Sequence, residues 1–215
     1  MFFEYGEYET EYLKSRDERM SAAIDRIGHI YREVDEDIFA SIVRSIIGQQ
    51  ISTKAQTTIC DRLQALIGEL TPENIGDATV EELRSVGLSA RKAEYILDAC
   101  DKIQSGKIDV GALYDMTDDE VTRVLTSIKG VGVWTAEMIM LFCMRRGDIF
   151  SYSDFGIKKG LRMLYQREDI DRESFDVYRR LFSPCGSVAG LYLWEIAGGA
   201  MPELVEPIFK RKKTE

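Results

Sequence analysis

The chain has 215 residues, of which 45% are hydrophobic and 30% charged, so it can form one sizeable core or two small subdomains. The longest unbroken apolar run, residues 138–144, is far shorter than the roughly 20 residues of a membrane-spanning helix, so we expect no membrane span. The net charge of −9 argues against a polyanionic partner, but it is unevenly distributed. Residues 1–37 hold eleven acidic and five basic residues, whereas residues 127–165 hold six basic and three acidic residues.

Helix-forming patterns follow one another along the chain, with apolar residues three or four positions apart between start and stop residues. The longer helices are predicted at residues 38–48, between Ser52 and Gly68, between Ser89 and Gly106, and at residues 133–146, 155–164, 172–182 and 187–197. Short helices are expected after Thr71, Thr79 and Thr117, the last two in capping boxes. No alternating pattern next to hairpin turns is present, so the predicted fold class is all-α.

Four features are expected to carry no site. The four cysteines lie about forty residues apart without a CxxC pair, which predicts reduced, mostly buried thiols rather than metal ligands. His29 is the sole histidine and is assigned to structure, and residues 210–213 are expected to form a solvated basic tail. The N-terminal segment lacks the basic start and apolar centre of a secretory signal, so we expect a cytoplasmic protein.

The segment from Leu125 to Leu161 contains the most informative pattern. Gly130 and Gly132 form a Gly-x-Gly hairpin between two apolar helices, and Lys129 lies next to it. Glycines there let backbone amides approach a phosphate oxygen at a helix N-terminus, with the lysine as a mobile cation. A tight turn in which glycine only relieves strain is the alternative interpretation of such a hairpin alone.

Four segments together resemble one family. They are GVGVWTA at residues 130–136, SIIGQQIS at 45–52, GLSARKA at 87–93 and SVAGLYLW at 187–194. This combination resembles the helix-hairpin-helix (HhH-GPD) DNA glycosylase superfamily, and within it the AlkA-like 3-methyladenine DNA glycosylase II branch. The resemblance implies two helical subdomains with an active-site cleft between them. One would comprise residues 38–148 with the hairpin at 125–146, and the other residues 1–37 plus 149–215 with the catalytic aspartate.

Asp154 is the candidate catalytic residue. It lies 22 residues after Gly132, which is the family's spacing between hairpin and catalytic aspartate. The resemblance implies that its carboxylate stabilises positive charge at the deoxyribose C1′ and orients or deprotonates the attacking water. An aspartate at a helix start is ordinarily a cap, and the spacing favours the catalytic interpretation.

Aromatic and methionine side chains are candidates for the wall of a base pocket. Trp134 and Trp194 match positions of pocket aromatics in the resembled enzymes, where cation–π contacts favour a cationic alkylated purine. Tyr152 is a further candidate wall, and Met138 stands where some relatives have tyrosine. For a buried tryptophan, ordinary core packing is the alternative.

The resemblance also implies a set of DNA contacts. One glutamine of the GQQIS turn would fill the gap left by the flipped nucleotide, and Gln50 is preferred over Gln49. The other predicted DNA-binding residues are Lys129, Gly130, Val131, Gly132, Thr135 and Lys158. Family hairpins often hold Na⁺ or K⁺, here on the backbone carbonyls of Thr126, Ile128 and Val131, and no other cofactor is expected.

Departures from related branches narrow the expected reaction. Bifunctional members carry a lysine nucleophile where this chain has Trp134, and no four-cysteine cluster spacing is present. The resemblance therefore implies a monomeric, monofunctional glycosylase without abasic-site lyase activity. It would excise alkylated purines such as 3-methyladenine and 7-methylguanine from double-stranded DNA in base excision repair. A non-catalytic DNA-binding protein and a glycosylase for oxidised or deaminated purines are the alternatives.

Overall fold

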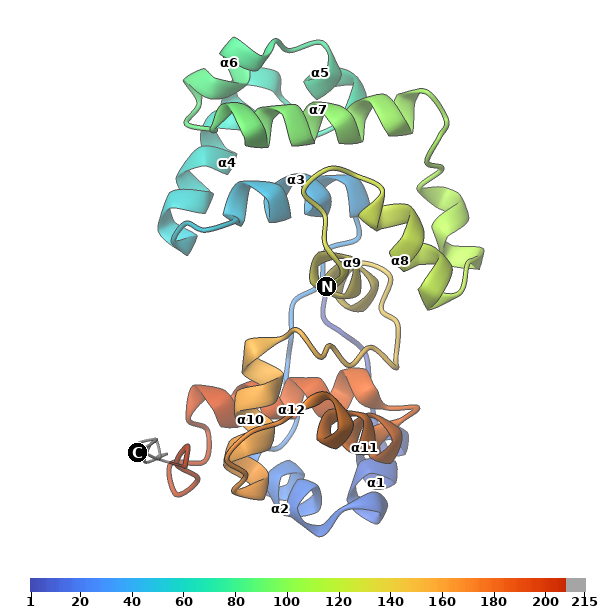
Figure 1. Cartoon of the computed structure of the whole chain (residues 1–215), viewed down its shortest axis with the longest axis vertical. Helices are drawn as coiled ribbons and strands as arrows, with labels where there is room; N and C mark the ends of the chain where they lie inside the picture. Colours follow the sequence, from blue (N-terminus) through green and yellow to red (C-terminus); the bar gives the residue numbers. More distant parts are fainter. Residues whose placement is uncertain (208–215) are drawn as a thin grey trace, which may run out of the picture. The chain divides into compact units, whose positions relative to one another are not determined.

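The computed structural model describes residues 1–207 and divides the chain into two compact units (Figure 1). One unit is Asp35–Met144, and the other combines Met1–Val34 with the chain from Arg145 onward. Residues 1–207 contain helices and no strand beyond an isolated bridge between Phe2 and Glu33, which confirms the all-α prediction. None of these helices is long and apolar enough to cross a bilayer. The predicted tail, residues 210–213, lies outside the described residues.

In the unit of residues 35–144, most helices begin directly after the cap residues that the sequence predicts. Its helices are α3 (Ile38–Gly48), α4 (Thr53–Ile67), α5 (Pro72–Gly76), α6 (Val80–Ser85), α7 (Ala90–Gln104), the 3-10 turn η1 (Gly111–Asp115), α8 (Asp118–Thr126) and α9 (Val133–Phe142). Asp37, Ser52 and Ser89 each accept a backbone N–H at a helix start, and both predicted capping boxes form. The core contains residues of α3 that are fully buried, among them Ile42, Val43 and Ile46.

The predicted end of α9 is wrong. The helix was expected to continue to Arg146, but it ends at Phe142 with Cys143 as its cap. Arg145 adopts a left-handed backbone with φ of 56°, which no helix interior can accommodate. The Met144 amide instead bonds back to the Ile139 carbonyl, which closes the helix earlier than its apolar pattern indicates.

Within residues 1–207 the other unit contains five helices, and four of them pack around α12. They are α1 (Glu7–Arg16), α2 (Glu18–Ile27), α10 (Phe155–Tyr165), α11 (Arg172–Phe182) and α12 (Gly186–Gly198). Most of α12 is buried, and α10 approaches it closely at Gly160. A Cβ on Gly160 would lie 2.3 Å from the Leu193 carbonyl oxygen, so only glycine permits this contact between the two helices.

Candidate functional site

Asp154 is the N-cap of α10 and is 6% exposed. Its Oδ1 atom accepts two N–H bonds, each 2.8 Å long, from the Ile157 amide and from the Trp194 indole Nε1. The first bond is the expected cap, and the second fixes the carboxylate against a side chain forty residues later. Asp154 therefore combines the cap geometry with a second contact that a cap does not require.

Gly156 makes room for the Trp194 ring. A Cβ on Gly156 would lie 2.5 Å from Trp194 Cδ1, closer than carbon atoms ordinarily approach, and 3.2 Å from Asp154 Oδ1. Sequence reasoning missed this residue. The signal that could have found it is the spacing of Gly156 and Gly160, one helical turn apart on a helix that packs against α12.

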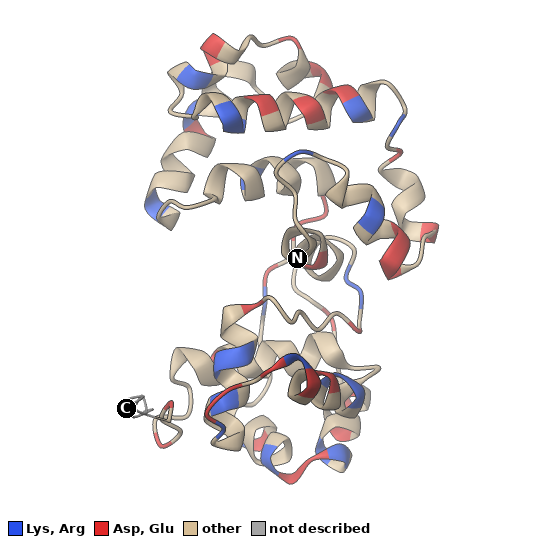
Figure 2. Cartoon of the chain, viewed as in Figure 1, with Lys and Arg blue, Asp and Glu red and all other residues tan. Residues whose placement is uncertain are grey.

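Tyr152 lies among cations and aromatic rings of the same unit. The Lys158 ammonium is 4.7 Å and the Arg172 guanidinium carbon 5.0 Å from its ring centroid. Phe175 contacts the ring edge-on at 5.2 Å. Figure 2 shows further basic residues along α10. Because the ring already contacts two cations, it would attract a cationic base less strongly. The role of Tyr152 as a pocket wall stays a prediction.

The hairpin between α8 and α9 requires glycine at one of its two positions. Gly130 has φ of +80°, and its Cβ would lie 2.1 Å from the Tyr95 ring. Gly132 is the N-cap of α9, and a Cβ there would meet nothing within 4 Å. Open space beside a helix N-terminus is the arrangement that lets a phosphate oxygen reach backbone amides. Thr135 is 7% exposed and belongs to the buried side of α9.

The hairpin amides differ in their partners. The Lys129 amide donates to Asp98 Oδ2 at 3.0 Å, and the Val131 amide to the Ile128 carbonyl at 3.1 Å. Within residues 1–207, the amides of Gly130 and Gly132 donate to no protein acceptor. Anion binding by these two amides, next to the Lys129 ammonium, stays a prediction.

The two adjacent glutamines after α3 have different surroundings. Gln49 Nε2 donates to the Gly130 carbonyl at 2.8 Å, so its side chain is tied to the hairpin. Gln50 is exposed and has φ of 58°, a left-handed conformation that is rare outside glycine. The structure thus separates the two candidates, and Gln50 is the one with an exposed side chain.

The two pocket candidates on α9 lie in the unit of residues 35–144. Trp134, in the first turn of α9, is 45% exposed. Met138, one turn later, is half-buried. A tryptophan this exposed is not an ordinary core residue, which disfavours the packing interpretation.

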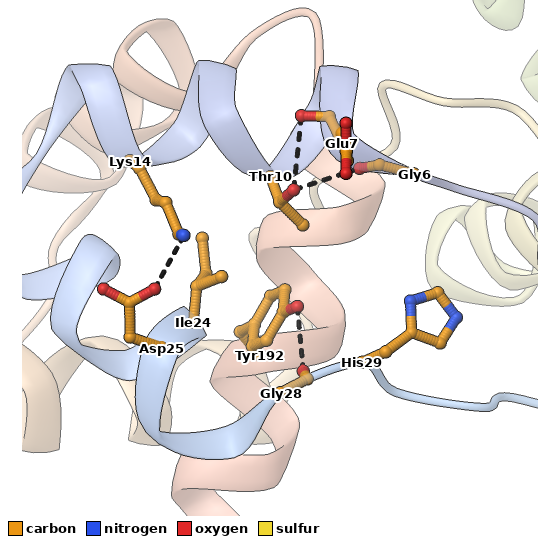
Figure 3. Close-up of a pocket in the computed structure, with 9 residues that line it drawn as sticks. All are labelled: Gly6, Glu7, Thr10, Lys14, Ile24, Asp25, Gly28, His29 and Tyr192. Carbon is orange, nitrogen blue, oxygen red and sulfur yellow. Dashed lines mark hydrogen bonds and ion pairs between the residues drawn. The ribbon is translucent and has the colours of Figure 1, made fainter.

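A separate cavity of about 400 Å³ is lined by α1, α2 and Tyr192 (Figure 3). It contains none of the predicted site residues, and His29 on its rim stacks on Tyr5 at 4.4 Å. Within residues 1–207, no group of three or more His, Cys, Asp or Glu side chains is arranged for a metal ion. All four cysteines are free, and burial raises the pKa of Cys100 to about 12 and that of Cys143 to about 11.

Comparisons with known proteins give a consistent result. The family described as "HhH-GPD superfamily base excision DNA repair protein" matches residues 43–186. A crystal structure of a DNA-3-methyladenine glycosidase from Bacillus halodurans is 34% identical, with a TM-score of 0.86 and 96% of both chains covered. A 3-methyladenine DNA glycosylase of Schizosaccharomyces pombe, solved with abasic DNA, is 25% identical, with a TM-score of 0.78 and 89% of this chain and 97% of that chain covered.

A putative DNA-3-methyladenine glycosylase of Bacillus subtilis is 28% identical over 172 residues. The match covers 75% of this chain and 59% of the longer relative.

Proposed function

The chain belongs to the HhH-GPD superfamily of base excision DNA repair proteins, and we propose that it is a monofunctional DNA glycosylase for alkylated purines. Its substrates would be bases of the 3-methyladenine and 7-methylguanine type in double-stranded DNA. The observation that carries this proposal is the buried Asp154 carboxylate held by the Trp194 indole. Relatives named for 3-methyladenine, similar over nearly the whole chain, support the choice of substrate.

The reaction is hydrolysis of the bond between the base nitrogen and the sugar C1′. As that bond breaks, the electron pair leaves with the base and positive charge develops on the sugar ring. A fixed carboxylate stabilises that charge, orients a water whose oxygen forms the new bond to C1′, and accepts the proton that this water loses. An alkylated purine is already cationic and leaves as a neutral base, so one carboxylate suffices without a strong general acid.

The Trp194 indole has two proposed roles. Its N–H holds Asp154, and its ring provides one wall of the base pocket. Trp134 would provide a second electron-rich surface for the cationic base, worth about 1–2 kcal/mol when desolvated. Met138 and Tyr152 are the remaining candidates for this pocket.

DNA would be bound chiefly through its phosphates. The amides of Gly130 and Gly132, at the start of α9, and the Lys129 ammonium are the proposed phosphate donors. Val131 and Thr135 would support the hairpin from its buried side, and Lys158 would add a second cation. The left-handed, exposed Gln50 is the proposed wedge.

A hairpin cation fits the chemistry of the residues present. Backbone carbonyl oxygens are hard donors that suit Na⁺ or K⁺, and Thr126, Ile128 and Val131 would supply them. The Ile128 carbonyl accepts the Val131 amide and retains a second lone pair. Such an ion would add positive charge for a DNA phosphate. We further propose a monomer that acts in the cytoplasm.

The test is base release from randomly methylated duplex DNA by the wild type and by Asp154→Asn. Asparagine caps helices as well as aspartate, so the variant should fold and bind DNA but lose nearly all release. Asp171→Asn is the matched control, because Asp171 caps α11 in the same way without contacting the site. Strand breaks should appear only after alkali, because Trp134 replaces the lyase lysine. Full activity of Asp154→Asn would refute the mechanism. Release of 8-oxoguanine from an oxidised duplex without any release from the methylated duplex would refute the substrate class.

A further inference from the structure

One face of α7 carries four side chains that the proposed reaction does not use. Lys92, Tyr95, Asp98 and Lys102 follow one another at spacings of three or four residues, so they lie along the same side of the helix. We call them the α7 stripe. All four lie in the unit of residues 35–144, as do the segments that they contact (Figure 1).

The first end of the stripe holds the turn that contains the proposed wedge. The Lys92 ammonium donates to the carbonyls of Ile47 and Gln49, at 2.8 and 2.7 Å. These carbonyls belong to the last turn of α3 and the residue after it, where a cation is favoured by the helix dipole. Lys92 therefore fixes the backbone directly before Gln50.

The rest of the stripe holds the hairpin. The Tyr95 ring packs against Gly130, Asp98 accepts the Lys129 amide at 3.0 Å, and Lys102 donates to the Ser127 carbonyl at 2.7 Å. Lys102 also pairs with Asp98, whose side chain is 14% exposed. The hydrogen bond from Gln49 to Gly130 also joins the turn directly to the hairpin. Lys92 and Asp98 lie six residues apart, so the turn and hairpin are anchored about 9 Å apart along one rigid helix.

The charge of Asp98 cannot help to bind a phosphate. Its carboxylate lies 3.5 Å from the Lys129 ammonium, which is a proposed phosphate contact, so it offsets positive charge where DNA would need it. Asp98 is therefore better explained by its effect on the geometry of the hairpin than by an effect on the affinity for DNA.

We propose that the α7 stripe positions the wedge turn and the hairpin relative to each other, with Lys92 and Asp98 as positioning residues for base flipping. This inference rests on the proposed function. Asp98 fixes the orientation of the hairpin amides, and Lys92 fixes the position of Gln50 relative to them.

The test compares Asp98→Asn with Asp101→Asn. Asp101 is on the same helix and pairs with Lys107 at the surface, which makes it a matched control. Base release is measured under single-turnover conditions. Base flipping is measured by the fluorescence of 2-aminopurine placed beside an abasic analogue. DNA affinity is measured by fluorescence anisotropy on undamaged duplex. Asp98→Asn should lower release and the flipping signal about ten-fold, because asparagine accepts the Lys129 amide through a weaker, uncharged hydrogen bond. Its affinity for undamaged duplex should fall by less than the flipping signal, because the removal of a negative charge offsets part of the loss of hairpin order.

A double-mutant cycle with Gln50→Ala separates positioning from general loss of structure. If Asp98 acts through the wedge, its effect on flipping should shrink in the Gln50→Ala background, whereas an unrelated defect would be additive. Should Asp98→Asn unfold, Lys92→Met, which keeps most of the side-chain volume, should give the same loss of flipping. Wild-type activity of both variants, or additivity in the cycle, would overturn the inference. Absence of base release by the wild type would instead refute the proposed function.

Discussion

Gly156→Ala should disrupt the hydrogen bond between Trp194 and Asp154. The new Cβ would lie 2.5 Å from Trp194 Cδ1, and carbon atoms need about 3.5 Å, so the ring must move by about 1 Å. The 2.8 Å bond from Nε1 to Oδ1 would then exceed hydrogen-bond length. A hydrogen bond to a charged group is worth about 2 kcal/mol, which corresponds to roughly a thirty-fold fall in the rate of base release.

Folding stability should fall by less than the rate of base release does. Gly156 lies in a helix at ordinary φ, so alanine would add up to about 1 kcal/mol of helix propensity, which offsets part of the lost hydrogen bond. A single-turnover release assay should therefore change more than the thermal midpoint. Gly198→Ala, also in a helix but with nothing within 4 Å of the added carbon, is the control. Wild-type release by Gly156→Ala would show that the indole bond does not orient the carboxylate.

Four further outcomes are expected. Trp194→Phe keeps an aromatic wall but lacks the N–H donor, so release should fall by a similar factor in the same assay, and an unchanged rate would contradict the role of the bond. Gly130→Ala should lower the thermal midpoint because of its φ of +80° and the Tyr95 contact, whereas Gly132→Ala should keep the midpoint and weaken duplex binding in anisotropy. Burial raises the pKa of Asp98, but the Lys102 hydrogen bond, the Lys129 amide and both lysine charges outweigh it and leave the pKa below 3.8. The stability that Asp98 adds should therefore be complete above pH about 4 and be lost as the pH falls further, measured as the difference between wild-type and Asp98→Asn midpoints at each pH. A thiol reagent at pH 8 should label half-buried Cys60 before the three buried cysteines, and early labelling of Cys100 would contradict its burial.

Local signals predicted most of the fold. The caps at Ser52, Thr79 and Thr117 form as expected because each depends on contacts within three or four residues. The predicted end of α9 was wrong because it depends on a backbone conformation that the apolar pattern does not show. Its apolar residues continue to Met144, but the left-handed turn at Arg145 ends the helical backbone.

The decisive contacts of the candidate site join residues far apart in sequence. Trp194 and Asp154 were each singled out by resemblance, but no spacing predicts that an indole N–H forty residues later bonds to the carboxylate. The bond from the Lys129 amide to Asp98 spans 31 residues and was missed entirely. Such contacts depend on how α10 packs on α12 and α7 on the hairpin, which periodicity within one helix does not encode.

The double duty of Asp154 as helix cap and proposed catalyst has a practical consequence. Asparagine can replace its cap bond to Ile157, so the chemistry can be removed while the helix that carries it stays intact. An Asp154→Asn protein would then be a stalled repair factor that occupies damaged sites and shields them from competing enzymes. Immobilised on a support, it would serve as an affinity reagent for recovering alkylated fragments from genomic DNA.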